Sequence, residues 1–180
     1  MKSFYCKGDG QYHDKNELPA SLRPFLDYTF SSGGVAGDDF KSFNTKFRNA
    51  IKKALPDGYV IHDWHKNHYE CSWVVKTPNN HFVYSSISDV RFFPNEWASN
   101  ILIRTMEHDK DWRGGYNQYT SVFSYAKDLE RIEKETLKKE ESMPSLDDVI
   151  ANAKANADAF AAGSSQPLAV SPIRSGREER

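Results

Sequence analysis

Residues 59–88 read YVIHDWHKNHYECSWVVKTPNNHFVYSSIS and contain three short runs that are rich in β-branched and aromatic residues. The runs are Tyr59 to Trp64, Tyr69 to Lys76 and His81 to Ser88. Turn-forming residues separate them at positions 65–68 and 78–80. Alternating runs of this length, bounded by turn residues, are typical of β-strands. The stretch therefore predicts an antiparallel meander of three strands.

Two helical patterns flank this meander. Asp39 to Leu55 repeats apolar side chains at helical spacing and is followed by the helix-breaking Pro56-Asp57-Gly58. Ser121 to Glu141 carries a second apolar stripe. The order helix, strands, helix predicts an α+β fold. Asn100 to Met106 fits either a fourth strand or the end of a helix, so we expect three or four strands in the sheet.

Aromatic residues divide the chain. They recur every few residues from Phe4 to Tyr125, and beyond that only Phe160 remains. We therefore expect an irregular N-terminal segment over 1–37 packed on an α+β domain over 38–141. A tail over 142–180 follows, with a short Ala-rich helix and a disordered end.

Composition narrows the possible environments. The chain has 180 residues and a net charge of −1, which excludes a strongly basic nucleic-acid-coating protein and an acidic disordered one. The sequence contains no run of about 18 apolar residues, so it predicts no membrane span. The first residues lack the apolar core of a secretory signal, and the two cysteines lie far apart. We expect a cytoplasmic protein, in the host cytoplasm if a phage encodes it.

The histidines at 62, 65 and 68, with Cys71, recur every three residues and suggest a zinc site. On a strand, however, that interval places successive side chains on opposite faces. No P-loop, nucleophile elbow or HExxH pattern is present. We therefore expect no metal site and no cofactor, and a protein that is not an enzyme.

The segment 103–120 combines charged, aromatic and amide side chains around Gly114-Gly115. Arginines there can bind carboxylates or phosphates, and the rings can stack on bases or anchor a protein partner. The same residues would otherwise pack the loop onto the sheet, with Arg104 paired to Asp109 or Asp111. His108, Asp109 and Asp111 also suggest a divalent cation and thus a metal-dependent enzyme acting on nucleic acid. The candidate binding residues are Arg104, Asp109, Asp111, Trp112, Arg113, Tyr116, Asn117 and Tyr119.

The first helix offers a second candidate surface. From Asp38 to Leu55 it has five basic and two acidic residues, a net charge of +3, with Lys46, Lys52 and Lys53 as candidate contacts. The element order is that of a double-stranded-RNA-binding domain, so a nucleic-acid-binding module is an alternative. The second helix starts with a single lysine, and the insertion 91–120 is foreign to that domain. A self-associating structural protein is a further alternative. The sequence leaves the oligomeric state unknown.

The pattern Ile103-Arg104-Thr105, Asp109-Lys110-Asp111-Trp112, Gly114-Gly115, Asn117 and Tyr119 resembles one in small accessory proteins of bacteriophages and mobile elements. The resemblance covers residues 58–120, although Trp112-Arg113 stands where Tyr-Thr is commoner. It implies a phage or plasmid origin and no established activity. It favours a non-enzymatic protein that binds and modulates a host protein or nucleoprotein complex. The sharpest version is an anti-defence inhibitor similar to anti-CRISPR proteins.

Overall fold

The computed structural model describes residues 3–26, 28, 30, 36–67, 69–111 and 115–163, without the side chains of 36–39 and 161–163. By its internal contacts the chain divides into two compact units, residues 1–138 and 139–180. Each unit is described by itself below.

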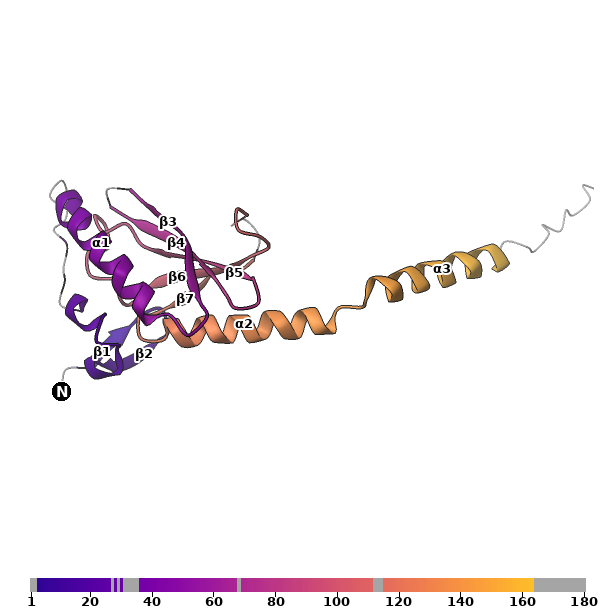
Figure 1. Cartoon of the computed structure of the whole chain (residues 1–180), viewed down its shortest axis with the longest axis horizontal. Coiled ribbons are helices and arrows are strands. Elements are labelled where there is room, and N and C mark those ends of the chain that lie inside the picture. The colour runs from indigo at the N-terminus through magenta and orange to yellow at the C-terminus, as the bar shows by residue number, and fades with distance from the viewer. Residues whose placement is uncertain are drawn as a thin grey trace, which may run out of the picture. The chain divides into compact units, whose positions relative to one another are not determined.

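The first unit is built on a five-stranded antiparallel sheet (Figure 1). Its strands follow chain order: β3 (Val60–Lys66), β4 (Cys71–Lys76), β5 (Phe82–Ile87), β6 (Ile101–Met106) and β7 (Gln118–Thr120). The predicted meander is confirmed. Residues 101–106 form a strand, β6, rather than the end of a helix. Two details differ from the prediction. β3 continues to Lys66, so residues 65 and 66 belong to the strand rather than to the expected turn. The sheet has five strands rather than three or four, because β7, which was expected to be loop, pairs with β6.

Helix α1 (Ala36–Ala54) and the beginning of helix α2 (Tyr125–Ser142) pack on the same face of this sheet, its inner face. The ring of Phe47 contacts Trp73 of β4 edge to face, at 5.9 Å between centroids. The hydroxyl of Tyr125 accepts a hydrogen bond from Trp73 Nε1 at 2.7 Å. The order helix, strands, helix and the α+β class are thus confirmed. The first helix starts at Ala36, before the predicted start at Asp39.

The hydrophobic core lies between this face and the two helices. Inward side chains alternate along the strands because successive residues point to opposite faces. The core includes Phe40, Phe43, Phe47 and Ile51 of α1, Trp73, Val75, Val83, Ile101 and Ile103 of the sheet, and Leu129 and Ile132 of α2. Three residues of the N-terminal segment, Leu18, Leu22 and Phe30, also belong to it, as do Val90 and Trp97 of the β5–β6 connection.

The N-terminal segment contains a hairpin, which corrects the expectation of irregular backbone over 1–37. Strands β1 (Ser3–Cys6) and β2 (Gln11–Asp14) pair antiparallel, and two short 3₁₀ turns follow, η1 (Lys15–Glu17) and η2 (Arg23–Phe25).

Hydrogen bonds fix the hairpin to the segment before β6 and to the segment before α2. In Figure 1 the hairpin lies beside the beginning of α2. Gly8 N–H donates to the carbonyl of Ser99 at 2.6 Å, and a Cβ atom on Gly8 would collide with the carbonyl of Thr120. Asp9 Oδ2 accepts hydrogen bonds from the hydroxyls of Ser121 and Ser124.

The second unit contains helix α3 (Leu146–Gly163). Ser145 caps this helix: Ser145 Oγ accepts from Asp148 N–H at 3.1 Å, and Asp148 Oδ2 accepts from Ser145 N–H. The expected Ala-rich helix of the tail is therefore present. The side chains of residues 146–160 are all exposed. The tail end that was expected to be disordered, 164–180, lies outside the described residues. No helix in the described part of the chain has the length and apolar character to cross a membrane.

Candidate functional site

The outer face of the five-stranded sheet, opposite α1 and α2, is the candidate site. Strand register places its side chains in rows, because residues paired across antiparallel strands lie on the same face. The middle row is Asp63, Val74, Tyr84 and Arg104, one residue from each of β3 to β6. The flanking rows are Val60, Lys76, Phe82 and Met106, and His65, Ser72, Ser86, Leu102 and Tyr119.

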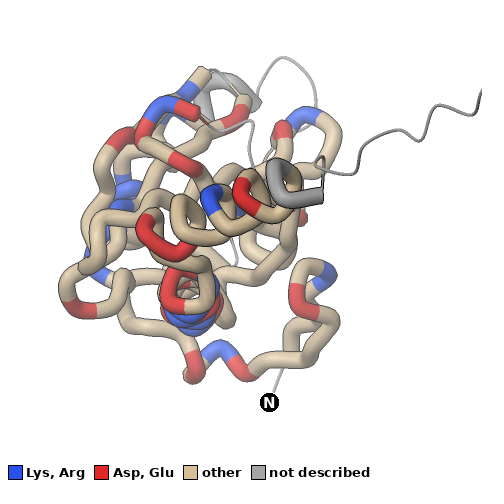
Figure 2. Tube along the Cα trace, turned by 90° about the vertical axis from the view of Figure 1, so that its right-hand side faces the viewer, with Lys and Arg blue, Asp and Glu red and all other residues tan. Residues whose placement is uncertain are grey.

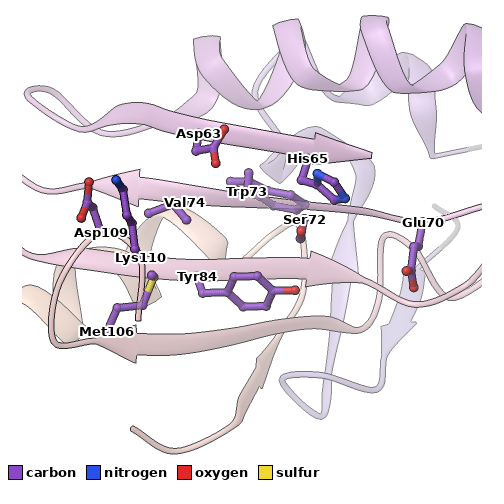
Figure 3. Close-up of a pocket in the computed structure, with 10 residues that line it drawn as sticks. All are labelled: Asp63, His65, Glu70, Ser72, Trp73, Val74, Tyr84, Met106, Asp109 and Lys110. Carbon is purple, nitrogen blue, oxygen red and sulfur yellow. The ribbon is translucent and has the colours of Figure 1, made fainter. Parts of the chain in front are cut away.

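A depression with a volume of about 540 Å³ lies on this face. Figure 3 shows its lining residues, which come from strands β3 to β6, from Glu70 just before β4 and from the loop after β6. Tyr84 lies across the middle of the view. The lining consists of Asp63, His65, Glu70, Ser72, Trp73, Val74, Tyr84, Met106, Asp109 and Lys110.

The loop 107–111 returns from the end of β6 to the edge strand β3. Asp109 Oδ2 lies 3.3 Å from Nε2 of His62, and the His62 ring contacts Phe82 at 5.2 Å between centroids. A β-bulge between Ile61 and Asp63 shifts the register next to this contact. The loop thereby frames one end of the depression.

Charges of both signs surround the depression. Asp63, Glu70 and Asp109 are acidic, Lys110 is basic, and His65 is close to them. Figure 2 shows the same interspersion of Lys and Arg with Asp and Glu along the trace. Lys76 and Arg104 of the same face add two more basic groups, so the charge of the face is mixed rather than of one sign. Mixed charge is complementary to the polar rim of a protein interface, whereas a phosphate-binding surface is predominantly basic.

The structure places Arg104 in β6, half-buried and opposite Tyr84. Its Nε donates to Oδ1 of Asn117 at 2.8 Å, which ties the strand to the segment before β7. Asp109, one of the two expected partners of Arg104, is instead paired with His62.

The two predicted tyrosines lie at the surface. Tyr116 is 86% exposed, and Tyr119, opposite Leu102 on the outer face, is 52% exposed. Gly115 has φ +83°, a left-handed backbone conformation that glycine adopts without strain. Trp112 and Arg113, as well as Gly114, lie outside the described residues.

The alternative cation site at His108, Asp109 and Asp111 is not formed. Among the described residues, the one group of three or more His, Cys, Asp or Glu ligands within reach of one ion is Cys6, Asp9 and His13. The spaced histidines do not converge with Cys71 either, because Cys71 lies on the inner face and His65 on the outer face. His68 lies outside the described residues. Burial strongly raises the pKa of the Cys71 thiol, which keeps it protonated and unreactive.

The predicted lysines Lys46, Lys52 and Lys53 are exposed on α1. Because α1 packs on the inner face of the sheet, these lysines lie on the other side of the sheet from Tyr84. The two surfaces that the sequence suggested are therefore separate.

Sequence reasoning missed a polar cluster in the N-terminal hairpin. His13 lies 2.9 Å from Asp9 through Nε2 and 2.9 Å from Glu17 through Nδ1. Burial raises the pKa of Asp9, but hydrogen bonds led by those from Ser121 and Ser124 outweigh it, so the pKa lies below its ordinary value. Burial and the nearby Asp9 carboxylate raise the pKa of Cys6 to about 11. The signal in the sequence is the spacing Cys-x2-Asp-x3-His-x3-Glu over residues 6–17.

Comparisons of the chain with protein-family models, with curated proteins and with solved structures found no match in any of the three.

Proposed function

We propose that the chain is a non-enzymatic binding protein that docks a partner protein on the outer face of β3 to β6. The observation that carries this proposal is the middle row of side chains around Tyr84, which neither α1 nor α2 covers. Half-buried apolar and aromatic groups within a polar surround are the composition of a protein interface, and tyrosine is a frequent anchor there.

The identity of the partner is part of the proposal. The resemblance of residues 58–120 to phage and mobile-element accessory proteins supports a host protein or nucleoprotein complex as the partner. The sharpest form is an inhibitor of a host defence complex, similar to anti-CRISPR proteins. The mixed charge around the depression supports contact with the protein part of such a complex rather than with its nucleic acid.

Variants on the two sides of the sheet test this proposal. Tyr84→Ala and, separately, the charge reversal Asp63→Lys are compared with the double variant Lys46→Ser, Lys52→Ser on α1. Affinity for candidate host complexes is measured by size-exclusion chromatography and titration calorimetry, with circular dichroism as the folding control. We expect each outer-face variant to weaken binding by about tenfold or more, and the α1 variant to bind as the native chain does. Equal affinity of all folded variants would refute the outer face as the docking surface.

The exposed lysines of α1 favour a second candidate function, nucleic-acid binding. Lysines on one helix face contact phosphates and release counterions, so such binding weakens steeply with salt. Gel shifts with double-stranded RNA and DNA at about 50 and 200 mM salt test it. A shift at low salt that disappears when Lys46, Lys52 and Lys53 are replaced by Ser would support this function. The absence of a shift at either salt concentration would exclude it.

A further inference from the structure

Three metal-binding side chains meet at the turn of the N-terminal hairpin. The ligand atoms of Cys6, Asp9 and His13 all lie within 4.8 Å of one another. Cys6 is 2% exposed, and the side chains of Asp9 and His13 are 7% and 9% exposed. Zinc bound to sulfur, nitrogen and oxygen holds its ligand atoms about 3–4 Å apart, so small movements suffice to place an ion among them.

The hairpin geometry brings these residues together. Phe4 pairs with His13 and Cys6 with Gln11, so the side chains of Cys6 and His13 lie on the same face of the hairpin. The turn between them positions Asp9, and its Gly10 has φ +69°, a conformation that glycine adopts without strain.

The surroundings of the cluster match those of a metal ligand set. A histidine that binds a metal through one ring nitrogen usually donates the other N–H to a carboxylate. Here Glu17 Oε2 lies 2.9 Å from His13 Nδ1, which leaves Nε2 directed to Asp9 and Cys6. Ser121 and Ser124 orient the Asp9 carboxylate, and the His13 ring stacks on Phe123 at 4.6 Å.

We propose that Cys6 Sγ, an oxygen of Asp9 and His13 Nε2 bind a divalent transition-metal ion, with zinc as the preferred ion. Thiolate, imidazole and carboxylate together are typical zinc ligands, and a water completes the tetrahedron. The ion replaces the hydrogen bond between His13 and Asp9, and the Cys6 thiol loses its proton to solvent on binding.

The site is accessible and has a structural role. Asp9 and His13 line an open depression of about 880 Å³, through which an ion reaches them. Since Asp9 also accepts hydrogen bonds from Ser121 and Ser124 before α2, the ion fastens the hairpin to the start of that helix. This role is separate from partner binding on the outer sheet face.

Metal titration of the full-length chain, free of any affinity tag and stripped with a chelator, tests the proposal. Zinc affinity is measured by competition with a chromophoric chelator, and Co²⁺ is used as a spectroscopic probe of thiolate coordination. We expect one zinc ion per chain, a higher Tm with zinc, and a thiolate-to-cobalt charge-transfer band. Glu17→Gln should weaken zinc binding by about 10- to 100-fold without changing the stoichiometry.

Matched variants separate this site from adventitious binding. Cys6→Ser should abolish the charge-transfer band. Cys6→Ser and His13→Gln should each lower the zinc affinity more than Glu17→Gln does. Cys71→Ala, which removes the other cysteine, and His62→Gln should bind as the native chain does. No zinc binding, or binding that survives in folded Cys6→Ser and His13→Gln, would overturn the proposal and assign the cluster to hydrogen bonding alone.

Discussion

At the residue scale, the hydroxyl of Tyr125 joins the start of α2 to the centre of the sheet. It lies 2.7 Å from Trp73 Nε1 and 2.7 Å from Ser85 Oγ, and all three residues are buried. Burial raises the pKa of the Tyr125 phenol, which stays neutral throughout the physiological range. Tyr125→Phe leaves the Trp73 N–H without its acceptor, so the free energy of unfolding should fall by about 1–3 kcal/mol.

Urea unfolding measures this loss. Tyr119→Phe is the matched control, because Tyr119 is half-exposed and its replacement should change the free energy of unfolding by less than about 0.5 kcal/mol. Equal stability of the two variants would mean that the buried hydroxyl contributes nothing.

A second residue-scale prediction concerns Glu133, which is buried beneath the turn between β4 and β5. Burial raises its pKa, but hydrogen bonds from His81, Asn79 and Thr77 outweigh that effect and hold the pKa below its ordinary value. The folded chain therefore binds this proton less readily than the unfolded chain. The resulting stability is fully present above the ordinary pKa of about 4.3 and is lost as the pH falls through the lower folded value.

Unfolding measured from pH 7 down to pH 3 tests this linkage. Glu133→Gln should flatten the acid loss of stability relative to the native chain. Glu130→Gln, on the exposed side of the same helix, controls for the removal of one negative charge. If the free energy of unfolding of Glu133→Gln falls as steeply with decreasing pH as that of the native chain, Glu133 is not the source of the acid loss of stability.

At the scale of elements, the attachment of the β1–β2 hairpin depends on Gly8. Its N–H bonds to Ser99, and there is no room for a Cβ beside the Thr120 carbonyl. Gly8→Ala should therefore detach the hairpin and increase amide hydrogen exchange over β1 and β2, with little change in β4 and β5. Gly10→Asn is the control, because nothing lies near a Cβ there and asparagine tolerates a positive φ. Unchanged exchange in Gly8→Ala would show that the backbone can shift at no cost.

The elements that the sequence predicted correctly are those whose periodicity reflects burial. Helix α1 and strands β4 and β5 each present several apolar side chains to the core, so their patterns are unambiguous. β7 buries only Thr120 within its three residues, too short a run for alternation to be visible. The hairpin leaves Tyr5 and Tyr12 exposed and buries Cys6 and His13, so its pattern is not that of an amphipathic strand.

The candidate site was less predictable than the fold, for a physical reason. Arg104, Asp109 and Tyr119 were singled out from local composition, and the structure places them around the outer face. The position of Tyr84 beside Arg104 depends on the register between β5 and β6, which the long connection between these two strands leaves open in the sequence. Likewise, Cys6, Asp9 and His13 become neighbours only when the hairpin closes.

At the scale of the whole molecule, the two units should contribute unequally to stability. The described side chains of α3 up to Phe160 are exposed, and a helix of this length without packing is marginal in water. A chain that ends at Ser142 should therefore keep the Tm and the urea midpoint of the full chain. Differential scanning calorimetry makes the comparison. A fall in Tm larger than the replicate error would show that the tail stabilises the first unit.

The two cysteines provide separate reporters of how the first unit opens. Both are free and buried, Cys6 in the hairpin and Cys71 at the start of β4. An alkylating reagent reacts only with a thiol that becomes accessible and ionised, so each labelling rate measures one kind of opening. Cys6 should be labelled whenever the hairpin separates from the rest of the unit, whereas Cys71 should be labelled only when the whole unit unfolds. Mass spectrometry measures both labelling rates without any added probe. The ratio of the Cys6 rate to the Cys71 rate then shows how often the hairpin opens while the rest of the first unit stays folded.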